Sequence, residues 1–516
     1  MIAKTYGAAV VGIDALVIRV ETSVEPGVNF MLVGLPDSAV KESHYRIATA
    51  LLHCGFKVPV RKIVINMAPA DLKKEGSAYD LTLAMGILAA SGQLNTGGQE
   101  ALDTERYMMM GELSLDGRLR PVKGALPLAI EARRQGFKGI VLPSVNAPEA
   151  ALVGDIEVYG ADTLQEVAGF FRGDIRMRPV SGDSLDKQDL ECLPEEPDFD
   201  EVKGQAFCKR ALEITAAGGH NILLVGPPGS GKTMLARRLS GILPPLTTDE
   251  ALETTKIYSV AGKMITARRL IRTRPFRDPH HTVSYAALVG GGSFPQPGEI
   301  SLAHNGVLFL DELPEFTRAT LEVLRQPLED RKISICRAKM RVDYPASFML
   351  VASMNPCPCG YYGSPDTPCT CKPSAVERYL NKVSGPLLDR MDLHVQVLPV
   401  PYQELASGSA GESSRSIRQR VMEARKIQTA RFSGTPLFCN AQMQSRQIQE
   451  YCRLSASSGA LLKNAMQRYG LSARTYHRIL KVARTIADLA GGGDITDVHV
   501  AEALHYRCID RSSYGR

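Results

Sequence analysis

The chain has 516 residues, a formal net charge of +6, 44% hydrophobic and 22% charged residues, and 11 cysteines. This length exceeds what one hydrophobic core usually supports, so we expect several domains, and the small net charge does not by itself indicate a polyanion partner. No apolar run reaches the roughly eighteen residues of a membrane span, and Asp14 interrupts the N-terminal apolar run, so we expect a cytoplasmic protein with reduced thiols and no membrane partner.

Residues 1–172 alternate between strand-like and helix-like patterns. Period-2 apolar runs predict strands, and apolar residues at helical spacing behind capping residues predict helices. An Asp-Gly turn between alternating residues predicts a hairpin. The predicted strands are 30–33 and 62–65, the helices are 38–54, 78–91 and 125–135, and the hairpin is 111–121. We therefore expect an α/β domain.

This first region resembles the Lon-protease-like domain of the ribosomal S5 superfamily, through the segments 74–78, 111–113 and 117–118. Lon-type proteases pair a serine nucleophile with a lysine, because the hydroxyl must lose its proton to attack an amide. The resemblance places Ala78 at the nucleophile position and Leu126 at the lysine position. We expect a protease fold that lacks the Ser/Lys dyad and serves assembly or partner contact.

A glycine loop follows a short apolar strand, Ile222 to Val225, and precedes a predicted helix. Its backbone N–H groups are expected to cradle phosphate oxygens at a helix N-terminus, with a lysine on the β- and γ-phosphates and a threonine hydroxyl on Mg²⁺. The predicted nucleotide-binding residues are Gly226, Pro227, Pro228, Gly229, Ser230, Gly231, Lys232, Thr233 and Met234.

A second apolar strand, 307–310, ends in the two carboxylates Asp311 and Glu312. Ligands of parallel sheets collect at the carboxyl ends of the strands, so Asp311 is expected to hold Mg²⁺ together with Thr233. Glu312 is expected to polarise the attacking water. The alternative, a buried strand with a solvated acidic end, is disfavoured because the pair follows the glycine loop by about eighty residues.

The segment 202–205 and the strand 350–355 extend a resemblance to AAA+ ATPases. The resemblance assigns Asn355 to the sensor-1 position, Arg390 to an arginine finger that reaches the ATP of a neighbouring subunit, and Arg474 to the sensor-2 position of a helical lid. An arginine finger requires an oligomer. A surface salt bridge is the alternative for Arg390, and an ordinary exposed arginine is the alternative for Arg474.

Two insertions narrow the family. The loop 274–301 resembles the helix-2 insert of magnesium-chelatase-like AAA+ proteins. A predicted hairpin with a basic crest follows Glu312, and its candidate DNA-binding residues are Lys332, Arg337, Lys339 and Arg341. Cations there can grip phosphates without reading sequence. An exposed basic hairpin without a ligand is the alternative.

Four cysteines in two close pairs, Cys357, Cys359, Cys369 and Cys371, occupy a glycine- and proline-rich loop. Four thiolates are typical of a tetrahedral structural zinc site with no open position, although the Cys-x-Cys spacing is less common than Cys-x-x-Cys. Buried or redox-active thiols are the alternative. We expect bound Zn²⁺ to fold this loop and not to take part in catalysis.

Together these features resemble the YifB/ComM family over essentially the whole chain. The expected domains are a Lon-protease-like domain at 1–172, an acidic linker at 173–198, an AAA+ core at 199–400 with the four-cysteine, zinc-ribbon-like insertion at 355–373, and a helical lid at 401–516. The resemblance implies an ATPase that forms a homo-oligomeric, hexameric ring and drives branch migration on single-stranded and branched DNA during natural transformation, with recombination proteins as partners.

Two other functions compete. A magnesium-chelatase-like motor subunit shares the ATPase core but is not expected to carry the Lon-like region or the four cysteines. An ATP-dependent protease is disfavoured by Ala78 and Leu126. The expected cofactors are ATP, Mg²⁺ and structural Zn²⁺.

Overall fold

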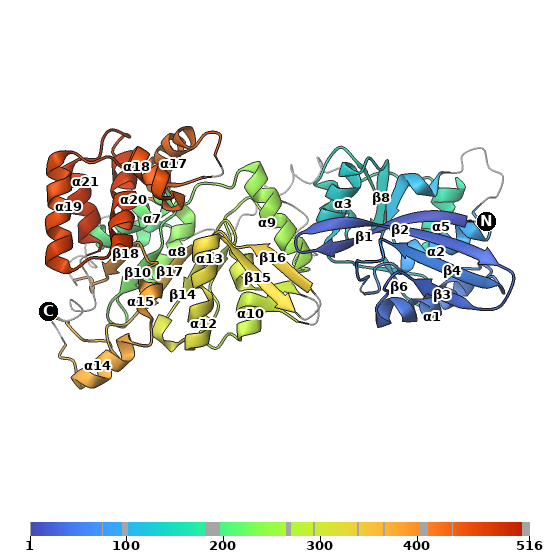
Figure 1. Ribbon diagram of the computed structural model, residues 1–516, viewed down its shortest axis with the longest axis horizontal. Helices are drawn as coiled ribbons and strands as arrows, with labels where there is room; N and C mark the ends of the chain where they lie inside the picture. The colour runs from blue at the N-terminus through green and yellow to red at the C-terminus, as the bar shows by residue number, and fades with distance from the viewer. Residues whose placement is uncertain are drawn as a thin grey trace. The chain divides into compact units, whose positions relative to one another are not determined.

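The computed structural model describes residues 2–74, 76–94, 102–180, 197–264, 270–292, 295–337, 340–364, 367–401, 411–435 and 437–507. The chain forms two compact units (Figure 1). The first unit comprises Met1–Leu193 and Thr248–Ile271, and the second comprises Pro194–Thr247 and Arg272–Arg516. Each unit has its own hydrophobic core. Within these described ranges, no helix is long and apolar enough to cross a membrane.

The first unit is built on a seven-stranded mixed sheet in the order β3-β4-β2-β1-β5-β8-β9. The β1–β2 and β2–β4 pairs are antiparallel, whereas β3–β4, β1–β5, β5–β8 and β8–β9 are parallel. The strands are β1 Ile2–Val11, β2 Asp14–Glu25, β3 Phe30–Val33, β4 Lys62–Ala68, β5 Tyr107–Met109, β8 Gly139–Pro143 and β9 Glu157–Ala161.

The helices of this unit are α1 Ser38–His53, α2 Asp80–Ala90, α3 Ala125–Arg134, α4 Ala147–Ala151 and α5 Leu164–Arg172, with the short 3₁₀ turn η1 Thr104–Arg106. The central helix α2 is buried on nearly all sides, as expected for a helix that is apolar all round. It approaches β2 closely at Gly86, where a Cβ atom would lie 2.6 Å from the Thr22 hydroxyl. The predicted hairpin consists of β6 Glu112–Leu113 and β7 Leu119–Arg120.

One helix of the first unit comes from a distant part of the sequence. Helix α9, Thr248–Val260, follows the glycine-loop helix along the chain but packs with α3. The Gly124 N–H donates to the Ser259 carbonyl at 3.2 Å, and Lys256 Nζ lies 2.9 Å from Asp14 Oδ1. The sequence analysis placed this segment inside the 199–400 ATPase core. Its contacts with α3 join it to the first unit, and its apolar side chains, such as Ile257, are buried.

The second unit contains a five-stranded, all-parallel sheet in the order β11-β14-β17-β10-β18. Its strands are β11 Phe276–Arg277, β14 Val307–Leu310, β17 Met349–Met354, β10 Ile222–Val225 and β18 Leu393–Gln396. The central strands β10, β14 and β17 are buried along their whole length, as parallel strands covered on both faces are. Sheets of this kind present ligand sites at the carboxyl ends of their strands.

Helices and short hairpins complete the second unit. Around the sheet lie η2 Phe199–Glu201, α7 Ala206–Gly218, α8 Lys232–Ile242, α10 Tyr285–Val289, α11 Glu299–Leu302, η3 Leu313–Glu315, α12 Arg318–Val323, α13 Arg325–Asp330, α14 Pro373–Leu380 and α15 Gly385–Leu388. The two small antiparallel pairs are β12 Gly290–Gly291 with β13 Gln296–Pro297, and β15 Lys332–Arg337 with β16 Met340–Pro345.

The C-terminal part of the described chain is helical. It consists of α17 Ser414–Arg431, η4 Asn440–Gln442, α18 Ser445–Tyr451, α19 Ala456–Tyr469, α20 Ala473–Leu489 and α21 Asp497–His505. Helix α20 begins behind the Ser472 cap, which accepts from the Thr475 N–H at 3.2 Å, and it packs on α7 of the same unit.

Candidate functional site

The predicted glycine loop joins β10 to α8, in the order strand, loop, helix. Gly229 and Gly231 have φ of 75° and 89°, which side chains rarely adopt. At Gly226 a Cβ atom would lie 2.2 Å from the Val397 carbonyl oxygen, so the loop can leave the strand only through glycine. The backbone therefore curls at the N-terminus of α8, where N–H groups can bind phosphate oxygens.

The Lys232 ammonium group lies at the centre of this loop. Its Nζ donates to the carbonyl oxygens of Gly226 at 2.9 Å and Pro227 at 2.8 Å, and to Asn355 Oδ1 at 3.1 Å. Burial lowers the pKa of Lys232, and the carboxylates of Asp311 and Glu312 oppose that shift. The predicted sensor-1 residue Asn355 thus lies within hydrogen-bond distance of the loop lysine.

The Asp311 carboxylate faces the start of α8. Thr233 Oγ1 donates to Asp311 Oδ2 at 2.7 Å, so the two predicted magnesium ligands are already neighbours. The other carboxylate oxygen, Oδ1, accepts from the Ser353 hydroxyl and from the Glu312 backbone N–H at 3.1 Å. A hydroxyl beside a carboxylate at the edge of a phosphate loop fits the oxygen preference of Mg²⁺.

Glu312 follows at the start of η3 in a left-handed conformation, with φ 53° and ψ 50°. Its side chain is 57% exposed, and Oε2 lies 3.7 Å from Nδ1 of His281. A carboxylate that is exposed beside the phosphate loop can reach a water molecule, as a general base must.

Arg390 and the residues around it lie at the other end of the sheet. Asn221, the residue before β10, donates from its backbone N–H to Asp392 Oδ2 at 3.0 Å and from Nδ2 to the Arg390 carbonyl at 3.0 Å. The glycine loop begins at Gly226, after β10. A four-residue strand spans about 13 Å, so Arg390 is separated from the phosphate loop of its own chain by the length of β10.

The Arg390 side chain is 7% exposed. Its guanidinium group donates to the Glu329 carboxylate and, at 2.6 Å, to the Pro386 carbonyl. Burial lowers the pKa of Arg390, and the positive charges of Arg325, Arg474 and Arg478 lower it further. The ion-pair partner is thus Glu329, and neither of the neighbouring carboxylates, Asp389 and Asp392, pairs with its guanidinium group in the described contacts.

Helix α20 brings two more arginines to this end of the sheet. Arg478 donates to the Arg390 carbonyl at 3.1 Å and also contacts Asp392. Arg474 is exposed one helical turn earlier, on the same face of α20. The predicted sensor-2 residue therefore lies with Arg390, and the predicted finger and sensor-2 arginines both stand apart from Lys232 of the same chain.

The basic hairpin forms as predicted from β15 and β16, with Lys332 opposite Pro345 and Cys336 opposite Arg341. Lys332 Nζ lies 3.4 Å and Arg341 Nε 3.5 Å from carboxylate oxygens of Asp343, and both cations remain exposed. Lys339 and the side chain of Arg337 lie outside the described residues. In the described part of the hairpin, Asp343 therefore partly neutralises the positive charge of Lys332 and Arg341.

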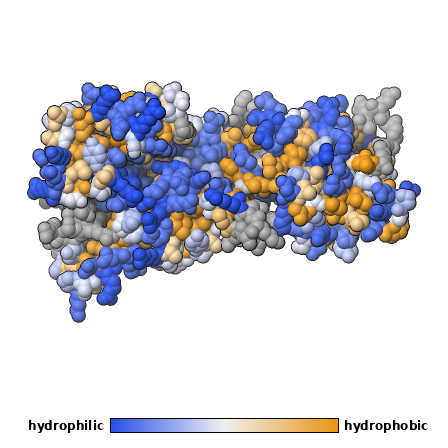
Figure 2. Space-filling view, viewed as in Figure 1, coloured by the Kyte–Doolittle hydropathy of each residue, from blue (hydrophilic) through white to orange (hydrophobic). Residues whose placement is uncertain are grey.

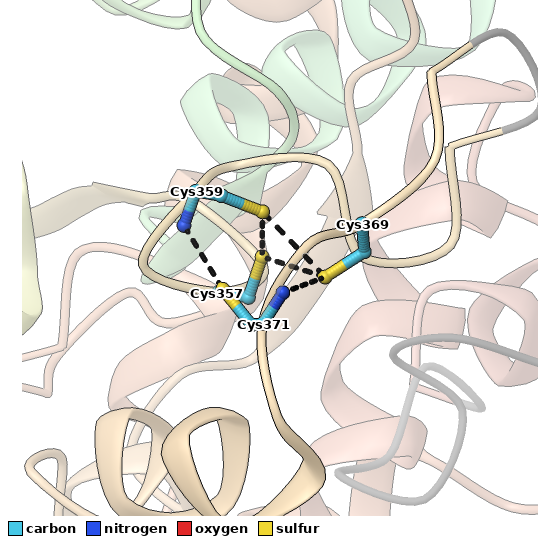
Figure 3. A group of neighbouring side chains, drawn as sticks. All are labelled: Cys357, Cys359, Cys369 and Cys371. Carbon is cyan, nitrogen blue, oxygen red and sulfur yellow. Dashed lines mark hydrogen bonds between the residues drawn. The ribbon is translucent and has the colours of Figure 1, made fainter.

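The four predicted cysteines form one cluster (Figure 3). Their sulfur atoms all lie within 4.8 Å of one another, and the Cys357–Cys359, Cys359–Cys369 and Cys357–Cys369 Sγ distances are 3.3, 3.5 and 3.7 Å. A tetrahedral zinc site with Zn–S bonds of about 2.3 Å places its sulfurs about 3.8 Å apart, so the donor set fits Zn²⁺. The loop also touches the phosphate loop, because a Cβ at Gly360 would lie 2.4 Å from Pro228 Cδ.

The cysteine environment differs from one thiol to the next. The Tyr361 backbone N–H stabilises the Cys359 thiolate and contributes most to lowering its pKa to about 5. At Cys369 the Cys371 N–H acts in the same direction, but burial and the neighbouring sulfurs outweigh it and raise the pKa to about 12. A cation within the cluster would favour the thiolate form of all four ligands.

The Lon-like region shows no serine–lysine contact among its described residues. Ala78 and Leu126 occupy the two positions that the resemblance assigned to the dyad. The hydroxyl of the adjacent Ser77 donates to Glu112, and the buried Lys74 ammonium group donates to the Pro69 carbonyl. Ser77 and Lys74, which lie close to the assigned nucleophile position in the sequence, therefore bind other groups and not each other.

Three residues at these sites were not identified from the sequence: Ser353, His281 and Glu329. Ser353 had a recognisable signal, because it lies two positions before Asn355 on a strand and alternate residues of a strand face the same side. His281 and Glu329 act across 31 and 61 positions of sequence, and no local pattern marks such pairs.

Comparisons with known proteins agree with this organisation. Family models match residues 198–405 as "Magnesium chelatase, subunit ChlI", residues 20–146 as "Subunit ChlI of Mg-chelatase" and residues 411–507 as "Magnesium chelatase, subunit ChlI C-terminal". The protein YifB of Salmonella typhimurium is 45% identical over 513 residues, covering 99% of this chain and 98% of the relative. The competence protein ComM of Haemophilus influenzae is 44% identical over 513 residues, with the same coverage.

A shorter similarity concerns the Lon-like region. Lon protease 2 of Thermus thermophilus is 30% identical over 143 residues, which is 26% of this chain and 16% of the protease. The matched families agree with the AAA+ core described above. The chain therefore belongs to the YifB/ComM family of magnesium-chelatase-like AAA+ proteins.

Proposed function

We propose that this protein is an ATP-hydrolysing, ring-forming DNA motor of the cytoplasm, and that it acts as a branch-migration helicase. In this role it extends heteroduplex DNA during natural transformation and homologous recombination. The observation that carries the ATPase part is the convergence of Lys232, Thr233, Asp311 and Asn355 at the carboxyl end of one parallel sheet.

Each residue at that end has a role in phosphoryl transfer. The glycine loop and Lys232 bind the phosphates, and Thr233 and Asp311 hold Mg²⁺, which neutralises charge on the phosphate oxygens. Glu312 accepts the proton of the attacking water, and Asn355 helps to place that water. Arg390 and Arg474 serve the nucleotide of a neighbouring copy, since the length of β10 separates them from the loop of their own chain.

Support for a DNA substrate comes from the relative named competence protein ComM and from the exposed cations of the hairpin. In a hexameric ring of copies, the exposed Lys332 and Arg341 offer contacts to phosphates of single-stranded or branched DNA. For a motor that acts on recombining DNA, we expect recombination proteins as the protein partners. Zn²⁺ on the four cysteines has a structural role, because four protein ligands leave no open position.

A second candidate is favoured by the family descriptions, which name a subunit of magnesium chelatase. In that case the same ATPase remodels a protein partner and does not move along DNA. Both candidates require the carboxyl-end site, but they differ in what stimulates hydrolysis.

The test measures ATP hydrolysis with single-stranded DNA, with forked DNA, with a porphyrin-binding partner protein and with an unfolded protein, together with particle size with and without nucleotide. We expect stimulation by DNA and a nucleotide-dependent increase in particle size. Glu312→Gln is the matched control: it should bind ATP, form the same particle and lose hydrolysis by about a hundredfold or more. Stimulation only by a protein partner would favour the second candidate.

A further inference from the structure

The Ser353 hydroxyl lies between the two acidic residues of the candidate ATPase site. Ser353 is fully buried on β17, and β17 pairs in parallel with β14, the strand that ends at Asp311. Leu310 is paired with Ala352, so Asp311 and Ser353 are the next residues in the same register. The sheet itself therefore places this hydroxyl beside the carboxylate.

A serine hydroxyl has one hydrogen to donate and lone pairs to accept with. Here the hydrogen goes to Asp311 Oδ1, and the oxygen accepts from the Glu312 backbone N–H at 3.4 Å. One side chain thus contacts both the carboxylate and the peptide group that follows it.

These contacts fix the orientation of the Asp311 carboxylate. Oδ1 is taken by Ser353 and by the Glu312 N–H, which leaves Oδ2 for Thr233. Without the Ser353 hydroxyl, Oδ1 would lose its side-chain donor and the carboxylate could rotate. A ligand carboxylate whose outer hydrogen bond is removed typically costs about 10- to 100-fold in metal affinity or activity.

The same hydroxyl supports the backbone of Glu312. A glutamate at φ 53° is in a conformation that non-glycine residues rarely adopt, and such residues persist only where the surroundings hold them. The held conformation turns the chain from β14 into η3, and the Glu312 side chain there is exposed and lies 3.7 Å from His281.

We propose that Ser353 is a positioning residue of the ATPase reaction, which orients Asp311 toward the magnesium side of the site and holds Glu312 in its working conformation. The proposal rests on the ATPase function proposed above. Ser353 has no described contact with the phosphate loop, so its removal should affect Mg²⁺ use and turnover more than nucleotide binding.

The test compares Ser353→Ala with the parent in the full-length protein. We expect the Mg²⁺ concentration for half-maximal hydrolysis to rise about tenfold or more, kcat to fall about tenfold or more, and nucleotide affinity measured in EDTA to stay within twofold. Ser353→Thr, which keeps the hydroxyl, should restore most of kcat. The matched control is Ser301→Ala, because Ser301 is equally buried and its hydroxyl has no hydrogen-bond partner among the described residues.

A double mutant separates positioning from stability. If Ser353 acts through Asp311, then Ser353→Ala should add little to Asp311→Asn, whereas independent sites give multiplied effects. Multiplied effects, or parent-like Mg²⁺ dependence and kcat in Ser353→Ala, would overturn the proposal. If the parent itself does not hydrolyse ATP while Ser353→Ala folds normally, the proposed function fails first, and the two failures are thus distinguishable.

Discussion

The two ends of the parallel sheet in the second unit differ in how complete they are. At the carboxyl end, the loop lysine, the threonine, the aspartate and the asparagine contact one another within one chain. At the amino end, Arg390, Arg474 and Arg478 gather without a phosphate-binding loop, and the described surface over α13 is largely hydrophilic (Figure 2). The carboxyl end thus brings together the predicted phosphate and Mg²⁺ residues of one chain, whereas the amino end gathers arginines, of which Arg390 and Arg478 pair with Glu329 and Asp392.

This difference indicates that each chain carries two halves of an ATPase site. The carboxyl end holds the phosphate-binding half, with Lys232, and the amino end holds the arginine half, with Arg390. Burial lowers the pKa of Arg390 most, the neighbouring arginines lower it further, and a bound anion would offset both effects. A head-to-tail arrangement of copies would bring the amino end of one chain to the carboxyl end of the next.

The largest effect is expected from Arg390→Ala. If Arg390 serves a neighbouring copy, its loss should lower kcat by about a thousandfold while ATP binding at the intact carboxyl end persists. Mixing equal amounts of Arg390→Ala and Lys232→Ala chains should then restore activity, because about a quarter of the boundaries would combine a native loop with a native arginine. Hydrolysis rates of the separate and mixed proteins check this.

The control for that mixture is Lys232→Ala mixed with Glu312→Gln, which places both defects at the carboxyl end and should stay inactive. Recovery in the control, or no recovery with Arg390→Ala, would contradict the two-half-site arrangement.

The cysteine cluster should stabilise the carboxyl end. Because the cluster loop packs on Pro228 at Gly360, Cys369→Ser should remove bound zinc, lower the unfolding temperature by about 5 °C and weaken ATP binding several-fold. Metal content, thermal unfolding and nucleotide affinity check the three parts. Cys336→Ser is the matched control, since Cys336 is exposed and lies outside the cluster. Full ATP affinity in a zinc-free variant would separate the cluster from the site.

The hairpin should contribute to DNA binding without affecting the carboxyl end. Replacing Lys332 and Arg341 by alanine should reduce the slope of log affinity against log salt by about 1.4 for single-stranded DNA, because two phosphate contacts are lost. DNA affinity at several salt concentrations checks it, with basal ATP hydrolysis as the internal control. An unchanged slope would remove these two residues from the DNA contact.

The smallest effect is expected at Glu329, which pairs with Arg390 and lies three positions before the hairpin strand β15. Glu329→Gln removes the negative charge that pairs with Arg390, and the Glu329 side chain is 55% exposed, so the pair is weak. If this pair restrains Arg390, its loss frees the guanidinium group for the neighbouring nucleotide, and we expect basal hydrolysis to rise about twofold to fivefold. Glu322→Gln, on a neighbouring helix and paired with Arg325, is the matched control. A fall in hydrolysis would show that Glu329 supports Arg390 rather than restraining it.

Local sequence was sufficient for the elements of the carboxyl end. The strands Ile222–Val225 and Val307–Leu310 are where the apolar runs predicted them, and the four cysteines meet because only a short loop separates the two pairs. Phe30–Val33 and the helix starting at Ser38 also agree, the latter because Asp37 accepts from the Val40 N–H as an N-cap.

Other features depended on contacts that local sequence does not record. Strand β1 was not predicted, because alanine, glycine and threonine weaken its strand signal. Strand β2 was not predicted either, although its valines, isoleucine and alternating burial are a local strand signal. The position of Arg474 at the amino end depends on how α20 packs, and the Ser353–Asp311 contact joins residues 42 positions apart. Both are set by tertiary packing.

The passage of α9 into the first unit has a practical consequence. The chain crosses between the units near residues 193, 247 and 271, so the first unit is not a continuous segment of sequence. A fragment that stops at residue 180 would lack α9 and expose the apolar side of α3, and a protease that cut only between 181 and 196 would leave the two pieces tied through α9. Anyone who wishes to isolate the N-terminal half should therefore supply residues 248–271 with it.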